Sequence, residues 1–180
     1  MDIYTRTGDD GTTGLLYGGR VAKDSLAPAA YGDVDEAQAA IGMARATVGR
    51  SGELDGLLTA IERDLWVLMA ELATAPQNRS KLTAGSTLVT EEMVGRLESS
   101  IDEYQTRYEA PREFVVPGQD PTSAALDFAR TVTRRAERST VALGLEGSVA
   151  AKYLNRLSDL LFVYARWAEG QWMAVRDVPE

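Results

Sequence analysis

"LDGLLTAIERDLWVLMAEL", residues 54–72, is the stretch that decides the fold. Its apolar residues recur in alternating steps of four and three, at Leu54, Leu58, Ile61, Leu65, Leu68 and Leu72. This spacing places them all on one face of a helix and is typical of the seam between packed helices. The stretch therefore predicts one helix of a helical bundle.

Four more segments carry apolar residues at helical spacing. Their series are Val34, Ala37, Ile41, Ala44 and Val48; Met93, Leu97, Ile101, Tyr104 and Tyr108; Ala125, Ala129, Val132 and Ala136; and Leu154, Leu157, Leu161, Tyr164 and Ala168. The breaks between helices are "VGRSGE" (48–53), "APQNRSKLTAGS" (75–86), "EAPREFVVPGQDP" (109–121) and "LGLEGS" (143–148). In the third break, Asp120 can cap the next helix and Pro121 suits its first position. We therefore expect an all-α protein, a five-helix antiparallel bundle.

The whole chain of 180 residues is expected to form a single domain, with a loop at 1–24 and the helical bundle at 25–175. It contains neither cysteine nor histidine, which excludes disulfides, thiolate sites and a histidine base. The net charge of −8 argues against a nucleic-acid partner. No apolar run approaches the roughly 20 residues of a membrane span, and residues 1–20 lack a secretory signal. The expectation is a soluble cytoplasmic protein.

The opening stretch "YTRTGDDGTTG", residues 4–14, departs from a plain bundle. Main-chain N–H groups near Gly8, Gly11 and Gly14 are suited to an anion-binding nest. Arg20 and Lys23 add positive charge nearby. The spacing matches neither a P-loop nor a dinucleotide fingerprint, so an ordinary turn region remains an alternative.

Two helical stretches also carry polar residues in a pattern. In "FARTVTRRAER" (128–138), Arg130, Arg134 and Arg138 recur every four residues and share one face. That face suits a polyanion or an interface, and a solvated basic stripe remains the alternative. In "YLNRLSDLLF" (153–162), Asn155 and Asp159 share a second face. Together the two faces are suited to surround a polar ligand.

The order of the motifs resembles one family. "YTRTGDDGTT", "GGRVAKD", "YGDVDE", "FVVPG", "ARTVTRRAER" and "YLNRLSDLLF", spread from about residue 3 to residue 166, are similar to the PduO-type ATP:cob(I)alamin adenosyltransferases. The resemblance implies a five-helix bundle that assembles as a homotrimer, with each active site between neighbouring subunits. It implies transfer of the 5′-deoxyadenosyl group of ATP to the cobalt of cob(I)alamin or a related corrinoid, with release of triphosphate. Mg²⁺, held mainly by the ATP phosphates, accompanies the nucleotide.

The same resemblance assigns residues to each side of the reaction. The implied ATP contacts are Thr5, Thr7, Gly8, Gly11, Thr12, Thr13, Arg20, Lys23, Arg134, Arg135, Glu137 and Asn155. Arg134 is implied to be the principal catalytic arginine, and Arg130 to pair with Asp35 across the subunit interface. Phe114 and Asp159 are implied for the corrinoid side, where Phe114 keeps the axial base away from the cobalt.

The resemblance also leaves alternatives and departures. A non-catalytic bundle that binds ATP or adenosylcobalamin, and stores, delivers or senses it, is the second hypothesis. A corrinoid reductase and an adenosylcobalamin-dependent enzyme are the implied partners. Gly14, Gln119 and Asp127 stand where the family has serine, glycine and histidine. We expect Asp127 to add negative charge beside the Phe114 segment and so to alter the corrinoid side.

Overall fold

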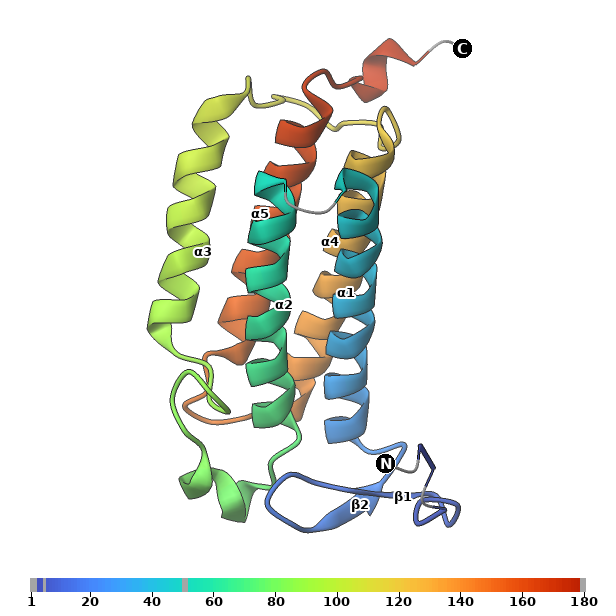
Figure 1. The fold of residues 1–180 in the computed structure, drawn as a ribbon, viewed down its shortest axis with the longest axis vertical. Coiled ribbons are helices and arrows are strands. Elements are labelled where there is room, and N and C mark those ends of the chain that lie inside the picture. The colour runs from blue at the N-terminus through green and yellow to red at the C-terminus, as the bar shows by residue number, and fades with distance from the viewer. Residues whose placement is uncertain (1–2, 5, 50–51, 179–180) are drawn as a thin grey trace.

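The computed structural model describes residues 3–4, 6–49 and 52–178. Within these ranges, five long helices run side by side (Figure 1): α1 (Leu26–Val48), α2 (Glu53–Leu72), α3 (Glu91–Tyr104), α4 (Pro121–Leu143) and α5 (Ala150–Glu169). Helix α1 packs against α2 and α4, and α5 packs against α4 and α3. The predicted all-α bundle is confirmed.

The shorter elements lie at the two ends of the bundle. They are the strands β1 (Thr12–Gly14) and β2 (Arg20–Ala22) and the 3₁₀ turns η1 (Pro76–Lys81), η2 (Gln105–Arg107) and η3 (Val175–Asp177). Figure 1 shows the β1–β2 hairpin and η1 at one end, and the α3–α4 connection with the C-terminal segment at the other. The sequence predicted only a loop for residues 1–24, so the hairpin is a finding of the structure.

The core follows the predicted seams. All six seam residues of α2 are buried, and Leu58, Leu65 and Leu68 are fully so. Helices α1 and α4 meet through small side chains, among them Ala37 and Ala136, which have no exposed surface. Small residues let two helix axes approach closely.

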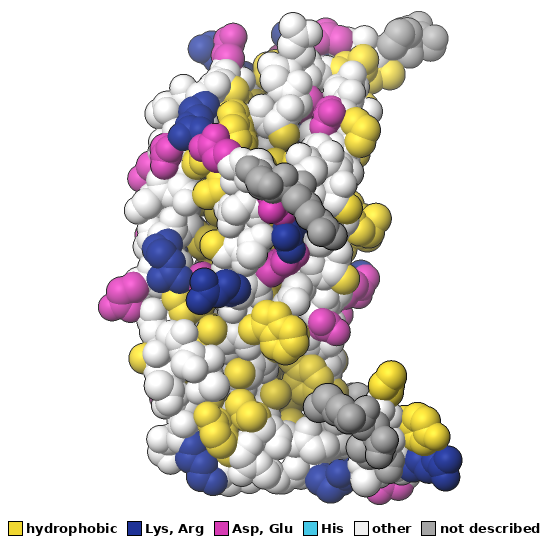
Figure 2. All heavy atoms as spheres, viewed as in Figure 1, with side chains coloured by type: hydrophobic (Ala, Val, Ile, Leu, Met, Phe, Trp, Pro, Cys, Tyr) yellow, Lys and Arg dark blue, Asp and Glu magenta, His cyan; other side chains and the backbone are white. Residues whose placement is uncertain are grey.

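On the face shown in Figure 2, basic and acidic side chains are interspersed with hydrophobic ones. Each helix in the described ranges falls short of the length or apolarity needed to cross a membrane.

The beginning of α4 agrees with the sequence, whereas the end of α3 does not. The Asp120 carboxylate accepts hydrogen bonds from the N–H groups of Thr122 (2.8 Å) and Ser123 (3.0 Å), the predicted cap. Helix α3 ends at Tyr104, before the predicted end at Tyr108. Tyr104 packs edge-on against Tyr164 with ring centroids 5.1 Å apart. The 3₁₀ turn η2 follows directly and reaches Arg107, one residue before the predicted end, and Tyr108 is partly buried against the core.

A buried carboxylate fixes the hairpin end of the bundle. Glu71 has no exposed surface and accepts hydrogen bonds from Arg79 Nη2 (2.8 Å), Val89 N (2.9 Å) and Ser148 Oγ (2.6 Å). A buried charge is tolerated only when it is paired in this way. Because its partners belong to η1, the segment before α3 and the α4–α5 connection, Glu71 ties three connections to α2.

Candidate active site

The β1–β2 hairpin is attached to the end of the bundle. In the antiparallel pair, Thr12 lies opposite Ala22 and Gly14 opposite Arg20. The N–H of Leu16 donates to the carbonyl of Ala73, just after α2, at 2.8 Å. Asn78 Nδ2 also donates to the carbonyl of Gly18, in the turn between β1 and β2, at 3.2 Å. The predicted nucleotide loop is therefore an ordered platform rather than a free turn.

Arg20 is already engaged inside this platform. Its Nε donates to Thr12 Oγ1 at 3.0 Å, and its Nη2 donates to the Thr7 carbonyl at 2.6 Å. These bonds fasten the turn at residues 7–12 to strand β2. Arg20 thus shapes the loop, and its predicted contact with ATP stays a prediction.

Lys23 lies against the main chain at Gly8. A Cβ atom at Gly8 would lie 3.2 Å from Lys23 Cε and Nζ and 3.0 Å from the Thr12 carbonyl oxygen. A larger residue at position 8 would therefore displace the end of the Lys23 side chain and press on the Thr12 carbonyl. In the described part of the chain, the Lys23 ammonium has no carboxylate within ion-pair distance. It is the cation of the loop best placed for a bound anion.

The remaining loop residues line the same turn. Gly11 has φ +82°, a backbone conformation that favours glycine. Both the N–H and the hydroxyl of Thr12 donate to Asp10 Oδ1, at 2.9 and 2.8 Å, and these bonds lower the pKa of Asp10. Thr13 pairs with Val21 in the hairpin. Thr5, a predicted ATP contact, lies outside the described residues.

The arginines of α4 have different environments. Arg134 is exposed, and its guanidinium has no hydrogen-bond or ion-pair partner within the described ranges. Arg130 is partly buried, with Nε 3.3 Å from Asp127 Oδ1. Arg135 turns toward α1, where it pairs with Glu36 and lies 3.5 Å from Asp33 Oδ1. Of the predicted cluster, Arg134 is the guanidinium left available to a ligand.

Glu137 and Asn155 are brought together between α4 and α5. Asn155 Nδ2 donates to Glu137 Oε1 at 3.1 Å, and Asn155 Oδ1 accepts from Arg156 Nη1 at 2.7 Å. Asp159 lies one turn further along α5, 3.7 Å from Arg156 Nη1. The two predicted ATP contacts thus form one polar cluster, even though their sequence positions lie on different helices.

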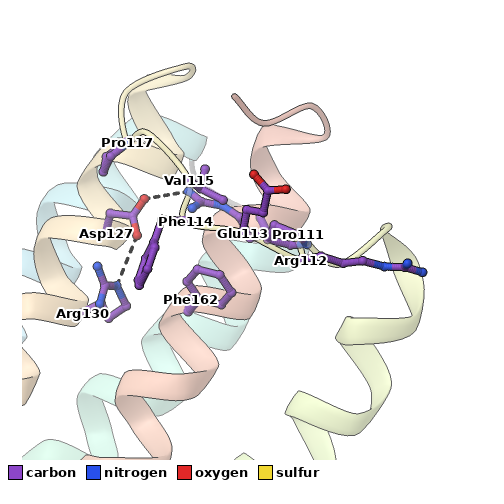
Figure 3. Close-up of a pocket in the computed structure, with 10 residues that line it drawn as sticks. Pro111, Arg112, Glu113, Phe114, Val115, Pro117, Asp127, Arg130 and Phe162 are labelled. Carbon is purple, nitrogen blue, oxygen red and sulfur yellow. Dashed lines mark hydrogen bonds and ion pairs between the residues drawn. The ribbon is translucent and has the colours of Figure 1, made fainter. Parts of the chain in front are cut away.

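Phe114 borders the larger of two adjoining cavities. This cavity, about 530 Å³, lies between the 111–117 segment and helices α4 and α5, and it is lined by Phe114, Phe162, Arg130, Asp127 and Arg166 among others (Figure 3). The second cavity, about 330 Å³, is lined by Arg130, Arg134, Asp159 and Phe162 among others. Because Arg130 and Phe162 line both, the cavities connect the predicted corrinoid residues Phe114 and Asp159 with Arg134.

A buried ion network underlies the larger cavity. Arg166 Nη2 donates to Asp127 Oδ2 at 2.6 Å, and Arg166 Nε lies 2.8 Å from Glu169 Oε2 without hydrogen-bond geometry. Burial raises the pKa of the Glu169 carboxyl, and the charge of Arg166 opposes this shift. Asp127 does place a carboxylate beside the Phe114 segment, and the structure pairs it with Arg166 and Arg130. The expected effect on the corrinoid side stays a prediction.

Sequence reasoning missed Arg166, Phe162 and Glu169. Arg166 is only 2 % exposed, yet it lines the larger cavity together with Phe162. The available signal was weak, a charged pair at i and i+3 near the end of an apolar helix. Only the packing of α5 against α4 turns that local pair into part of a site.

The two halves of the predicted site lie at opposite ends of one chain. The hairpin is at one end of the bundle, and the Phe114 segment is at the other (Figure 1).

Asp35, the predicted partner of Arg130, is exposed on α1 and has no ion-pair partner in the part of the chain that the structure describes. Among the described residues there is also no group of three or more acidic side chains suited to a metal ion.

Comparisons with known proteins identify relatives of this chain. A family model described as cobalamin adenosyltransferase matches residues 3–168. The corrinoid adenosyltransferase of Mycobacterium leprae (strain TN) is 45 % identical over 172 residues, covering 92 % of this chain and 90 % of that protein. The corrinoid adenosyltransferase of Bacillus subtilis (strain 168) is 40 % identical over 172 residues, covering 92 % and 86 %.

Solved structures show the same fold. A phenylalanine-to-histidine variant of a PduO-type ATP:corrinoid adenosyltransferase from Lactobacillus reuteri, complexed with cobalamin and ATP, superimposes with a TM-score of 0.86 at 32 % identity. The match covers 98 % of this chain and 97 % of that one. Taken with the family match over residues 3–168, these similarities show that the chain belongs to the cobalamin adenosyltransferase family.

Proposed function

We propose that this protein is an ATP:corrinoid adenosyltransferase that transfers the 5′-deoxyadenosyl group of ATP to the cobalt of cob(I)alamin or a related corrinoid. The observation that carries the proposal is the unpartnered guanidinium of Arg134, which lines a cavity adjoining the one that Phe114 borders. Membership of the family and the solved relative with cobalamin and ATP support the same reaction.

The chemistry explains why a chain without histidine or cysteine suffices. The cobalt of the reduced corrinoid supplies the electron pair for the new bond to C5′. The bond between C5′ and the triphosphate oxygen breaks, and its electrons leave with triphosphate. No proton has to be removed, so the protein has to position the two substrates and stabilise the leaving polyanion.

The nucleotide side consists of two polar surfaces. The loop surface offers Lys23 and the glycine turn at Gly8 and Gly11, and the helix surface offers Arg134 and the Glu137–Asn155 pair. A guanidinium binds phosphate oxygens in a fixed fork, which suits Arg134 to the triphosphate. Thr7, Thr12, Thr13, Arg20 and Arg135 complete the proposed ATP contacts. Mg²⁺ enters with the ATP phosphates.

We further propose that a homotrimer joins these surfaces. In one chain the hairpin and the Phe114 segment lie at opposite ends of the bundle. The exposed carboxylate of Asp35 would pair with Arg130 of a neighbouring copy, and the hairpin would then face the arginines of that copy. The expected setting is the cytoplasm, with a corrinoid reductase as electron donor and an adenosylcobalamin-dependent enzyme as recipient.

The corrinoid side is apolar at its rim. The Phe114 side chain is 89 % exposed, which leaves a large aromatic surface in water. A flat corrin ring would cover this surface, and burying it is favourable by about 1.5–3 kcal/mol. Phe162 lies across the cavity from it, and Asp159 lies at the far side of the adjoining cavity. We assign both Phe114 and Asp159 to corrinoid binding.

An anaerobic assay tests the proposal. The protein is mixed with ATP, Mg²⁺ and chemically reduced cob(I)alamin, and the loss of the Co(I) absorbance is followed. Adenosylcobalamin and triphosphate in equal amounts are the expected products. If ATP binds but neither product forms, the transferase proposal fails, and the non-catalytic storage or sensing hypothesis takes its place.

A further inference from the structure

We propose that the C-terminal segment, residues 171–178, is a brace that positions Phe114 for the corrinoid. The inference rests on the proposed function, because Phe114 is the residue assigned there to the corrinoid. The brace follows the last helix and contains no residue of the motifs that indicated the family. It meets the Phe114 segment about 60 residues away in sequence, through main-chain pairing.

Two main-chain hydrogen bonds flank the pairing. The N–H of Val175 donates to the carbonyl of Phe114 at 2.9 Å, and the N–H of Val116 donates to the carbonyl of Met173 at 2.9 Å. Between them, Val115 lies opposite Ala174 in an antiparallel bridge. Ala174 is 1 % exposed, so the pairing is covered rather than open to water. This is a single antiparallel bridge between Val115 and Ala174, directly beside Phe114.

Side chains reinforce the same contact. Trp172 Nε1 donates to the Glu109 carbonyl at 3.3 Å, and Arg176 Nη1 lies 2.6 Å from Glu113 Oε1. Among the residues that the structure describes, every main-chain hydrogen bond from residues 109–119 to another segment goes to residues 172–175. Main-chain hydrogen bonds therefore tie the Phe114 segment to the brace.

The direction of Phe114 depends on this pairing. Its side chain is 89 % exposed, so packing does not fix where it points. Successive side chains of an extended strand project to opposite faces. Fixing Val115 against Ala174 therefore also fixes the side to which Phe114 projects, and Phe114 borders the larger cavity. Without the brace, the aromatic ring would have to be ordered when the corrinoid binds, at an entropic cost.

One substitution removes a bond of the brace with little other change. Val175→Pro deletes the N–H that donates to Phe114. The preceding residue, Ala174, has φ −75° and ψ 148°, a conformation well suited to precede proline. Val175→Ala is the matched control, because it shortens a half-exposed side chain and keeps the N–H. Thermal unfolding of both variants verifies that the bundle remains folded.

The expected result is a selective effect on the corrinoid. Val175→Pro should raise the KM for cob(I)alamin roughly fivefold to tenfold, the effect of one lost hydrogen bond of ordinary net strength. The KM for ATP should stay at the parent value. The control variant Val175→Ala should keep the parent KM for the corrinoid. In a Phe114→Ala background, Val175→Pro should have no further effect, because the residue that it positions is gone.

Equal effects of Val175→Pro and Val175→Ala would overturn the brace, as would an undiminished effect in the Phe114→Ala background. A parent protein without turnover would defeat the proposed function instead. In that case the dissociation constant for cob(II)alamin, measured by absorbance titration, tests the brace independently. This dissociation constant should rise by the same factor in Val175→Pro. The inference is overturned if the constant is unchanged in the variant, or if the parent does not bind the corrinoid at all.

Discussion

Asp127 on α4 and Arg166 on α5 form a buried ion pair, with Arg166 Nη2 2.6 Å from Asp127 Oδ2. Asp127 is 4 % exposed and Arg166 is 2 % exposed. The pair joins two helices directly beneath the cavity that Phe114 borders. Asp127 also contacts Arg130, so a carboxylate at this position holds two arginines at once.

Asp127→Asn should destabilise the bundle. The substitution keeps the shape of the side chain but leaves the buried charge of Arg166 undercompensated, a loss of about 3–5 kcal/mol in the free energy of unfolding. Urea denaturation measures the change. Glu91→Gln is the control, because it removes an exposed ion pair with Lys152, and such pairs contribute about 0–1 kcal/mol. Similar effects of the two variants would show that the buried pair contributes no special stability.

Glu169 makes the stability depend on pH. Burial raises its pKa above the ordinary value of 4.5. At pH values just above 4.5 the folded protein keeps the proton on Glu169 that the unfolded chain has lost, so the parent loses stability as the pH rises through the folded pKa. Glutamine does not titrate. The stability of Glu169→Gln relative to the parent should therefore increase as the pH rises from about 4 to about 7. Urea denaturation across this range provides the measurement, and a difference independent of pH would contradict the assignment.

Arg134→Ala should abolish most of the activity without affecting the fold. The side chain has no partner within the described ranges, so its removal breaks no internal contact. Losing one donor to the developing polyanion should lower kcat by about 100-fold to 1,000-fold. Arg138→Ala is the control, since Arg138 lies one turn further on the same face and its Nη1 bonds to the Arg134 carbonyl. Steady-state kinetics compare the two, and a normal kcat for Arg134→Ala defeats the proposed role.

Asp35→Asn should weaken the proposed subunit contact. Asp35 is exposed on α1, and neutralising it would remove the partner proposed for Arg130 of a neighbouring copy. We expect a higher KM for ATP and a smaller fraction of trimer at low protein concentration, measured by sedimentation velocity. Asp102→Asn, on the exposed side of α3, is the control for charge alone. If trimer mass and ATP kinetics both match the parent, the ion pair is misassigned.

Local patterns in the sequence predicted the helices well. The seam from Leu54 to Leu72 is buried throughout, and Asp120 caps α4 as expected. These features depend on residues within a few turns of one another, which is the range over which helical periodicity and capping act. The α-helix itself ends at Tyr104, and the tighter 3₁₀ turn η2 completes the predicted segment as far as Arg107, a change of helix type that the apolar series does not reveal.

The sequence by itself determined the five helices and the family, and it predicted which residues face the two substrates. Only the tertiary structure decided that Asp127 is neutralised by Arg166, and that Phe114 is held by residues 172–175. Each of these contacts joins residues that are distant along the chain. No local pattern specifies such a pair, because its geometry exists only after the helices have packed and brought the two segments together.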